Sequence, residues 1–411
     1  MQLMLYRILW LLITPLTLAW SLQQMASRQG GWTYLLHRWG FAKLTDCPPI
    51  AAWFHAASVG EMRLAMPLIN AVLEHGVLVT CNTPEAYRLA IATWGNAAEV
   101  AYCPLDYRQS VKRFLAKFRP SVALIIETEI WPELYEQCHQ RGIGIYIVNG
   151  RISDKTFQSA LAKRWVYPMA LRQVEGVWAR EQSDADRFIA MGCPSDRVHA
   201  AGSIKMSRRV RVGIPHNPVP HRGFSLAIST HHGEEALITE VWRSVNKGDL
   251  LVLVPRHPAR AQGVITALES QGLSVRRSSQ CSELDTQIDV LVVDTVGEVD
   301  AYCAHASFVF VGGSMVDAGG HNVFEPASWG KAIIVGPYTQ NFSAEMEYLS
   351  ARDAITIVET KEALLQSWAR LSHDMPHRHR CEASTRQAYA ALPDRISDYV
   401  ALVEQAMKVR A

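Results

Sequence analysis

The chain has 411 residues, of which 49% are hydrophobic and 19% are charged, and its formal net charge is +2. This length suits two domains rather than a single core, and the hydrophobic content excludes wholesale disorder. The small net charge neither favours nor excludes an anionic partner, whereas the eight scattered cysteines, none in a C-x-x-C pair, argue against zinc ribbons and thioredoxin-like redox sites.

An apolar run, ILWLLITPLTLAW, extends from Ile8 to Trp20 and follows Arg7. A cleaved signal peptide is disfavoured because the run ends in a poor cleavage site. A membrane span of about 20 apolar residues requires residues 1–6 to be counted as well, so an anchor lying in the membrane interface competes with it, and a buried N-terminal helix remains the alternative to both. Basic and aromatic residues that suit the headgroup layer follow the run: Arg28, Trp32, Tyr34, Arg38, Trp39 and Lys43. We expect a membrane anchor, with the body of the protein on the cytoplasmic side.

Short apolar runs then alternate with helical patterns. We expect a helix at 62–73 and strands at 51–54, 77–80, 121–126, 143–148, 226–229, 250–254, 290–293 and 308–311. Unalternated apolar strands separated by helices predict parallel sheets covered on both faces. We therefore predict two doubly wound, Rossmann-like α/β domains after the anchor. The expected boundaries are 1–45 for the anchor and interfacial segment, 46–207 for the N-terminal domain, 208–223 for a proline- and arginine-rich linker, and 224–411 for the C-terminal domain, whose last helix is a candidate to return to the N-terminal domain.

The segment HAASVGE, from His55 to Glu61, stands at a strand-to-helix turn. Ser58 and Glu61 have the spacing of a capping box, which would make Glu61 a helix-start residue. The alternative is that Glu61 faces the ligand edge of the sheet as a general base. Spacing alone leaves both interpretations open.

The segment ETEIWP places Glu127 and Glu129 at the end of a buried strand. Carboxylates two residues apart on an extended segment point to the same side. Buried charges need a partner, which could be a ligand or an arginine such as Arg151. A ligand site and a structural ion pair therefore both fit this motif.

The second half carries the sequence GGSM at 312–315 and GGHNVFEP at 319–326. Paired glycines allow close approach of a ligand, and a helix beginning near Asn322 would offer free N–H groups to a phosphate. Glu325 could then reach two ribose hydroxyls. Arg256 in VPRHP is a candidate phosphate or base contact, and Thr295 with Glu298 has capping-box spacing. The adjacent histidines His231 and His232 suggest a metal site only weakly, because the nearby acidic residues lie at helix starts.

The motifs as a set resemble the bacterial 3-deoxy-D-manno-octulosonic acid (Kdo) transferases of the GT-B glycosyltransferase fold. They occur in the family's order over nearly the whole chain: HAASVGE, ETEIWP, NGRIS, GSIK, STHHGEE, VPRHP, DTVGE, FVGGSM, GGHNVFEPA and GPYTQNF. The resemblance implies an inverting transferase that moves Kdo from CMP-Kdo to a lipid A precursor, lipid IVA, at the cytoplasmic face of the bacterial inner membrane, in lipopolysaccharide synthesis.

The resemblance also implies residue roles. Glu61 matches the family's proton acceptor, and Ser58, Glu127 and Glu129 match acceptor-side positions. The positions that match the CMP site are Pro255, Arg256, Val296, Gly297, Glu298, Asn322, Val323, Phe324 and Glu325. Lys205 in GSIK is a candidate partner for the Kdo carboxylate. Because the donor carries one phosphate, no metal or other cofactor is expected, and no nucleic-acid partner is implied.

Two segments depart from the family pattern. The strand that usually closes with Thr-Gly here reads TCNTPE from Thr80 to Glu85, and Glu133 stands where an asparagine usually follows ETEIWP. Both lie on the acceptor side, so a GT-B transferase with another donor or acceptor remains the alternative. A dinucleotide-dependent oxidoreductase is disfavoured because no G-x-G-x-x-G follows the first strand. A membrane scaffold would not explain carboxylates and glycines gathered at strand ends.

Overall fold

The computed structural model describes residues 2–27, 30–43, 49–162, 165–208, 213–220, 222–245, 248–280 and 287–409. The chain forms two compact units, one comprising Met1–Ser207 with Asp394–Ala411 and the other comprising Arg208–Pro393. The predicted linker, 208–223, follows this boundary; residues 209–212 and 221 lie outside the described part, and 213–220 contain no helix or strand.

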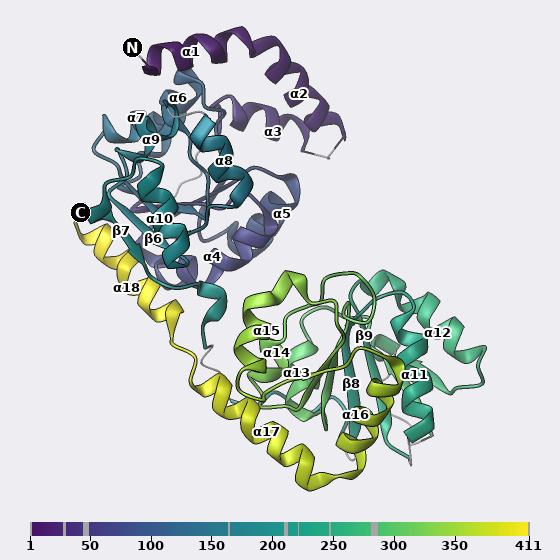
Figure 1. The fold of residues 1–411 in the computed structure, drawn as a ribbon. Helices are drawn as coiled ribbons and strands as arrows, with labels where there is room; N and C mark the ends of the chain where they lie inside the picture. Colours follow the sequence, from purple (N-terminus) through teal and green to yellow (C-terminus); the bar gives the residue numbers. More distant parts are fainter. Residues whose placement is uncertain are drawn as a thin grey trace. The chain divides into compact units, whose positions relative to one another are not determined.

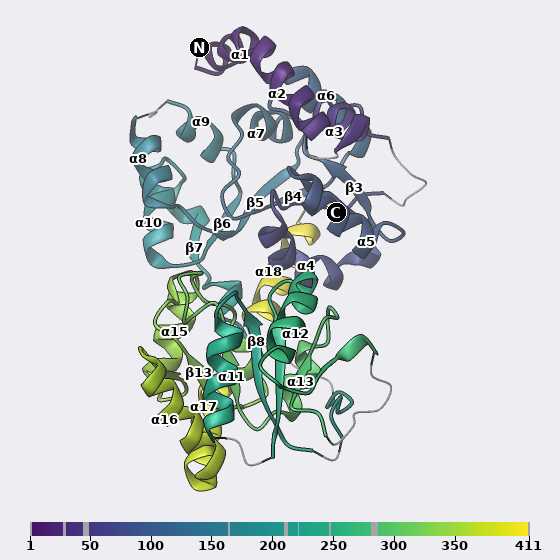
Figure 2. The same ribbon diagram turned by 90° about the vertical axis from the view of Figure 1, so that its right-hand side faces the viewer.

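The first unit is built on a seven-stranded parallel sheet with the order β3-β2-β1-β4-β5-β6-β7 (Figures 1 and 2). Its strands are β1 (Ala52–His55), β2 (Val77–Cys81), β3 (Glu99–Tyr102), β4 (Val122–Ile126), β5 (Gly144–Gly150), β6 (Gly176–Ala179) and β7 (Val198–Ala200). The helices are α1 (Gln2–Leu12), α2 (Thr14–Ser27), α3 (Gly31–Arg38), α4 (Val59–Ala71), α5 (Pro84–Trp94), α6 (Arg108–Phe118), α7 (Pro132–His139), α8 (Asp154–Ala162), α9 (Tyr167–Leu171), α10 (Gln182–Ala190) and α18 (Arg395–Lys408).

Both faces of this sheet are buried, which explains the unalternated apolar strands. In β1, Trp53 packs into the core on one face with Phe114, while Phe54 packs into the core on the other face with Leu68. All four residues of β1 are buried. Successive side chains of the strand therefore point alternately into two apolar layers, rather than alternately into the core and into water.

The second unit repeats this architecture with the strand order β10-β11-β9-β8-β12-β13-β14. Its strands are β8 (Phe224–Thr230), β9 (Leu250–Pro255), β10 (Val275–Arg277), β11 (Val290–Val292), β12 (Val309–Val311), β13 (Ile333–Val335) and β14 (Thr356–Ile357). The helices are α11 (Glu234–Val245), α12 (Ala261–Glu269), α13 (Val299–His305), α14 (Phe324–Ala327), α15 (Ser343–Ser350), α16 (Lys361–His373) and α17 (Met375–Ala390). In both units the order reverses beside the first strand, which is the point where ligands bind in open parallel sheets.

The last helix, α18, packs on the first unit although the chain reaches it from the second. Tyr399 is fully buried, and its hydroxyl donates to the carbonyl of Gly202 at 2.9 Å. The N–H of Ile396 donates to Ser207 Oγ at 3.1 Å. The first unit is therefore made of two segments of the chain, with the whole second unit between them in the sequence.

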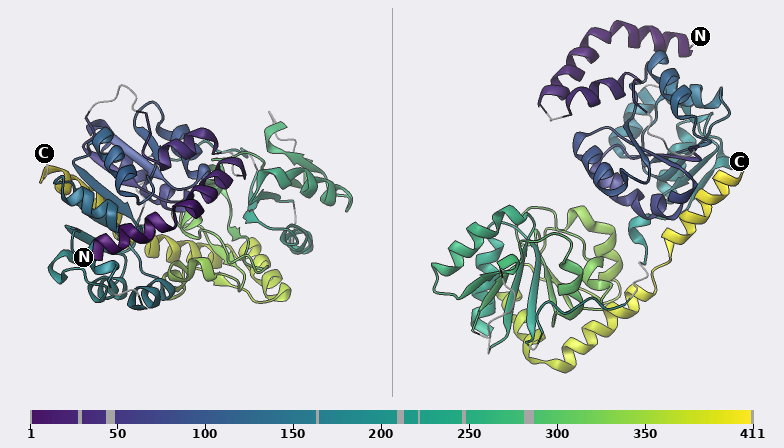
Figure 3. Two further views of the ribbon diagram at one scale, coloured as in Figure 1. Left: turned by 90° about the horizontal axis from the view of Figure 1, so that it is seen from above. Right: turned by 180° about the vertical axis from the view of Figure 1, so that it is seen from behind.

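The N-terminal apolar run forms two helices, α1 and α2, bent by 58° relative to each other (Figure 3). The bend lies beside Pro15, which has no N–H to continue the first helix. Among the described helices, none is individually long and apolar enough to cross a membrane, although this bent pair meets the length and composition together. The expectation of one continuous anchoring helix is therefore not supported.

Several residues expected in the headgroup layer have other roles. Tyr34 is 1% exposed and Arg38 is 7% exposed, so both belong to the interior of the first unit. Trp39 stacks on Tyr107 with ring centroids 5.3 Å apart. Trp32 and Lys43 are exposed as expected, and Arg28 lies outside the described residues.

Candidate active site

The carboxyl ends of neighbouring strands in the first unit bring together residues that are far apart in the sequence. β1 ends at His55, β2 leads to Asn82, and β4 leads to Glu127 and Glu129. Parallel strands share one carboxyl edge, so these polar groups meet above the sheet. Glu61 joins them from the first turn of α4.

Glu61 has the capping role that was one of the two interpretations, and its position remains compatible with the other, a general base. Ser58 is the N-cap of α4 and accepts from the Glu61 N–H at 3.3 Å, while the Glu61 carboxylate accepts from the Ala57 N–H at 2.7 Å and from the Ser58 hydroxyl at 3.1 Å. This is a capping box in which the return bond reaches Ala57. Burial raises the pKa of Glu61, although the bond from Ala57 and the nearby His55 oppose the rise. A carboxylate with a raised pKa at a ligand edge is suited to proton abstraction.

The two carboxylates of ETEIWP do not sit on an extended segment. Glu127 has φ +60°, a left-handed conformation that is costly for a residue with a side chain and that recurs at functional sites. The expected parallel alignment of Glu127 and Glu129 therefore does not hold. Arg151 forms no ion pair with either residue in the described structure; its carbonyl instead accepts from the Thr128 hydroxyl.

Glu129 finds its partners on other strands. Its Oε2 atom accepts from Asn82 Nδ2 at 3.1 Å and from Trp131 Nε1 at 2.9 Å, and it lies 3.7 Å from His55 Nε2. Burial raises the pKa of Glu129, but the nearby charge of His55 and the hydrogen bond from Trp131 outweigh this effect, and the net pKa is lowered. Glu129 is therefore held as a carboxylate.

Asn82 and Arg38 were not predicted as site residues. Arg38 Nη1 donates to Asn82 Oδ1 at 2.7 Å and to the carbonyl of Cys103 at 2.6 Å, which turns the Asn82 amide toward Glu129. Asn82 belongs to the segment that departs from the usual Thr-Gly ending. Nothing in the local sequence around Arg38 signals this contact, because its partners lie 44 and 65 residues away.

In the second unit, the glycine-rich turn after β12 is occupied by a carboxylate of the protein itself. Glu234 is fully buried and accepts from the N–H groups of Gly313, Ser314 and Met315 at 2.7, 3.1 and 3.0 Å. A Cβ at Gly313, where φ is +68°, would lie 2.9 Å from the His321 ring. These glycines therefore allow internal packing, and the expectation that the pair at 312–313 offers its backbone to a ligand is wrong.

The helix expected near Asn322 begins later and is short. α14 contains four residues and starts at Phe324, whose N–H donates to Asn322 Oδ1 at 3.0 Å. Val323 and Phe324 are buried, so only their backbone could face a ligand, whereas Asn322 is exposed and Glu325 is half-buried in the first turn. The helix dipole available to a phosphate is correspondingly small.

The other predicted donor residues lie at the same carboxyl edge. Arg256 follows the buried Pro255 at the end of β9, and its side chain is exposed. Val296 is 87% exposed, and Gly297 has φ +93° with open space around it. The Thr295 hydroxyl contacts the Glu298 carboxylate, but α13 begins at Val299, so the expected capping box does not form.

His231 and His321 form a stacked pair at this edge. Their Nε2 atoms are 2.8 Å apart, so one ring donates and the other accepts. Burial lowers the pKa of His321 to about 4, and the charges of Arg256, His231 and His257 add to this effect. No group of three metal-ligating side chains occurs among the described residues.

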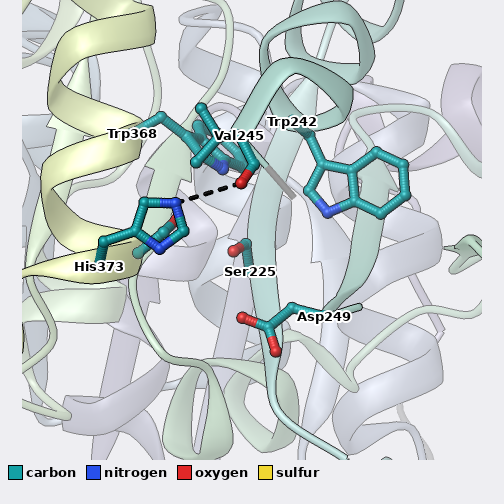
Figure 4. Close-up of a pocket in the computed structure, with 7 residues that line it drawn as sticks. Ser225, Trp242, Val245, Asp249, Trp368 and His373 are labelled. Atoms are coloured by element: carbon teal, nitrogen blue, oxygen red, sulfur yellow. Dashed lines mark hydrogen bonds between the residues drawn. The ribbon is translucent and has the colours of Figure 1, made fainter. Parts of the chain in front are cut away.

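A cavity of about 90 Å³ in the second unit lies away from the carboxyl edge of the sheet (Figure 4). It is lined by Ser225, Trp242, Val245, Asp249, Trp368, Ser372 and His373. Ser225 stands at the amino end of β8, opposite to the edge that carries Thr230 and Arg256. The cavity is therefore not part of the candidate donor site.

Lys205 is exposed in a single turn, Ile204–Met206, of the first unit. The neighbouring N–H of Ile204 donates to Asn149 Oδ1 at 3.0 Å, and Asn149 has φ +53° at the end of β5. This ties the Lys205 turn to the carboxyl edge of the first sheet.

The chain is similar to known proteins in sequence and in fold. Residues 33–208 match the family model described as 3-deoxy-D-manno-octulosonic-acid transferase (kdotransferase). The chain is 32% identical over 402 residues to the 3-deoxy-D-manno-octulosonic acid transferase of Bordetella pertussis, covering 92% of this chain and 93% of that protein. It is 28% identical to the enzyme of the same name from Haemophilus influenzae, covering 84% and 85%. The UDP-GlcNAc 2-epimerase of Neisseria meningitidis shares the fold, with a TM-score of 0.54, 11% identity, and coverage of 87% of this chain and 99% of that one.

Proposed function

The chain belongs to the 3-deoxy-D-manno-octulosonic acid transferase family and is a glycosyltransferase that transfers Kdo; from this we propose that its donor is CMP-Kdo and its acceptor the lipid A precursor lipid IVA. The observation that supports the reaction most directly is Glu61, a carboxylate of raised pKa held at the carboxyl edge of the first sheet. A transferase needs such a group to activate the acceptor hydroxyl.

The proposed reaction is a single displacement with inversion. Glu61 takes the proton of an acceptor hydroxyl, the oxygen forms a bond to the anomeric carbon of Kdo, and the bond from that carbon to the CMP phosphate breaks with its electron pair going to CMP. Ser58, Glu127 and Glu129 line the acceptor edge. Arg256 is the candidate cation for the phosphate, with residues 296–298 and Asn322 and Glu325 beside it for the nucleoside.

Metal independence is part of the proposal, because CMP carries one phosphate and Arg256 is an exposed cation at the donor edge. We expect the purified enzyme to keep full activity in EDTA, measured as Kdo incorporation into lipid. A loss of activity that Mg²⁺ restores would contradict this expectation.

We also propose that the protein works at a membrane surface with its N-terminal helix pair against the lipid. Large apolar side chains are exposed along α1 and α2, namely Met4, Leu5, Ile8, Leu9, Leu11, Leu12, Leu16, Leu18, Trp20 and Leu22. α6 begins beside them, since Tyr107 Oη lies 2.6 Å from Thr17 Oγ1, and it exposes Arg108, Arg113 and Lys117. Exposed apolar side chains together with exposed basic residues on the neighbouring helix suit an anionic membrane, such as the cytoplasmic face of a bacterial inner membrane.

The substrates are tested by mass spectrometry of the products formed by purified protein. With CMP-Kdo and a tetra-acylated lipid A precursor, we expect the lipid to gain the mass of Kdo. Parallel reactions with a UDP-sugar, and with the precursor replaced by a non-lipid sugar, test the two alternatives. Transfer in either parallel reaction, with none to the lipid from CMP-Kdo, would overturn the assignment.

A further inference from the structure

A buried histidine lies beneath the acceptor edge and has no role in the reaction described above. His55 ends β1 and is fully buried. Its Nδ1 atom lies 2.9 Å from Thr80 Oγ1, which also accepts from Trp53 Nε1 at 2.8 Å. Its Nε2 atom is buried, has no hydrogen-bond partner in the described structure, and lies 3.7 Å from Glu129 Oε2.

A buried imidazole nitrogen without a hydrogen-bond partner lowers the stability of the fold, so its presence at the acceptor edge calls for a functional reason. A polar ring atom buried without a hydrogen bond loses the full energy of its hydration. The Nε2–Oε2 separation is too long for a direct hydrogen bond but short enough for a strong charge interaction. The structure therefore couples His55 to Glu129 through charge, while Thr80 and Trp53 fix the ring from the other side.

Glu129 is restrained on two further sides. Asn82 Nδ2 and Trp131 Nε1 both donate to the same Oε2 atom, and Arg38 fixes the Asn82 amide. In the described structure, the donors to the Glu129 carboxylate and the His55 ring all approach the Oε2 atom, which fixes the orientation of the carboxylate. The side chain is 24% exposed, so this carboxylate reaches the edge of the site.

We propose that His55 is a positioning residue for the transfer reaction, whose imidazole orients Glu129 and favours the ionised form of the carboxylates at the acceptor edge. This inference rests on the proposed role of Glu61 as the base. His55 touches no substrate in the proposal and acts through Glu129 and Glu61.

The charges around His55 support a cationic ring. Burial lowers the pKa of His55, but the neighbouring Cys103 and Glu129 outweigh burial, so the net pKa is raised to about 10. The groups that face the pair from the surrounding elements are Glu61 from α4, Cys103 after β3, and Arg38 from α3. Glu127 acts on Glu61 in the opposite sense, raising its pKa. His55 is the group in this set that lowers the pKa of both Glu61 and Glu129.

The pH profile of kcat/KM tests the proposal in His55→Asn. Asparagine can keep the bond to Thr80 but carries no charge, so the pKa of Glu61 should rise and the acid limb should move to higher pH by about one unit. Thr80→Val is the matched control, because it disturbs the same buried cluster and leaves the imidazole charge in place; its acid limb should stay where it is. An unshifted limb in His55→Asn, with a fall in melting temperature equal to that of Thr80→Val, would reduce His55 to a structural residue and overturn the proposal.

A second measurement does not depend on the identity of the base. In protein labelled with ¹⁵N-histidine, the His55 resonances, assigned from the His55→Asn spectrum, should remain those of a protonated ring at pH 8. In Glu129→Gln the ring should titrate at lower pH. A neutral His55 at pH 8 in the wild-type protein would also overturn the proposal. If Glu61→Gln proves fully active, the proposed base fails, and these spectra still decide the role of His55.

Discussion

Single carboxylates in this protein combine a structural and a chemical task. Glu61 completes the start of α4 by accepting from Ala57, and it is also the group of raised pKa at the acceptor edge. The two tasks are compatible because a carboxylate has two oxygens with several acceptor positions. They can be separated by a substitution that keeps the acceptor and removes the basicity.

Glu61→Gln makes this separation. The amide oxygen can still accept from the Ala57 N–H, so α4 should keep its start and the melting temperature should change little. Turnover should fall by roughly 10²–10⁴-fold, the usual contribution of a general base. CMP affinity, measured by calorimetric titration, should be unchanged because the predicted CMP residues lie in the other unit. Near-normal turnover would remove Glu61 from the mechanism.

Glu325 presents the same question on the donor side. If it binds the ribose, Glu325→Ala should weaken CMP binding by about 1.5–3 kcal/mol for each hydrogen bond lost, with little effect on the melting temperature without ligand. If it only interacts with the dipole of α14, the stability should fall by roughly 0.3–1 kcal/mol and CMP affinity should hold. Because α14 has four residues, we expect the first result. Titration of CMP beside a thermal melt of the ligand-free variant distinguishes the two.

At the scale of elements, α1 is attached to the start of α7 by buried polar groups. The Tyr6 hydroxyl donates to Asp106 Oδ2 at 2.7 Å, and Arg7 donates to Glu133 at 2.6 and 3.0 Å. Asp106 also accepts from the N–H groups of Glu133 and Leu134, so it caps α7 directly after the ETEIWP motif. The glutamate that departs from the family pattern therefore has its partner in the N-terminal helix.

Arg7→Met should destabilise this attachment. It leaves the fully buried Glu133 with Gln137 as its remaining side-chain donor, and stranding a buried charge costs roughly 3 kcal/mol or more. Adding Glu133→Gln should recover most of the loss, because the unpaired charge is then gone. Hydrogen exchange at the α7 amides reports the attachment locally. Equal exchange in the single and double variants would show that the pair is not coupled.

At the scale of the whole molecule, the exposed apolar surface of α1 and α2 has a measurable consequence. Leu12 and Leu16 are 71% and 72% exposed. Changing both to Glu should weaken binding to anionic vesicles by roughly tenfold per leucine, from the apolar area each would bury. Ile214→Glu is the matched control, since Ile214 is 77% exposed but lies outside these helices. Co-sedimentation with vesicles measures binding by both variants. Binding by the wild-type protein should fall with salt because of the exposed basic residues of α6.

Co-sedimentation has a second possible result that would contradict the proposed surface. If the Leu12 and Leu16 double variant binds as well as the wild-type protein, or if Ile214→Glu weakens binding equally, then the helix pair is not the part of the molecule that meets the lipid.

Features that depend on local patterns could be predicted from the sequence. Unbroken apolar runs identified the central strands β1, β2, β4, β5, β8, β9, β11 and β12, since a strand covered on both faces must be apolar throughout. Ser58 and Glu61 were placed correctly at a helix start because capping depends on residues three apart. The strands β3, β6, β7, β10, β13 and β14, which include the four edge strands of the two sheets, were not predicted, because short runs such as Val275–Arg277 look like loops until a neighbouring strand pairs with them.

The partners of the polar residues could not be predicted in this way, because they depend on the tertiary fold. Glu129 could have met Arg151, but the fold gives it His55, Asn82 and Trp131. The glycines at 312–313 looked like a ligand turn, but Glu234 already satisfies the N–H groups there. A contact between residues tens of positions apart leaves no local pattern, because its energy depends on strand order and on which buried groups remain to be satisfied.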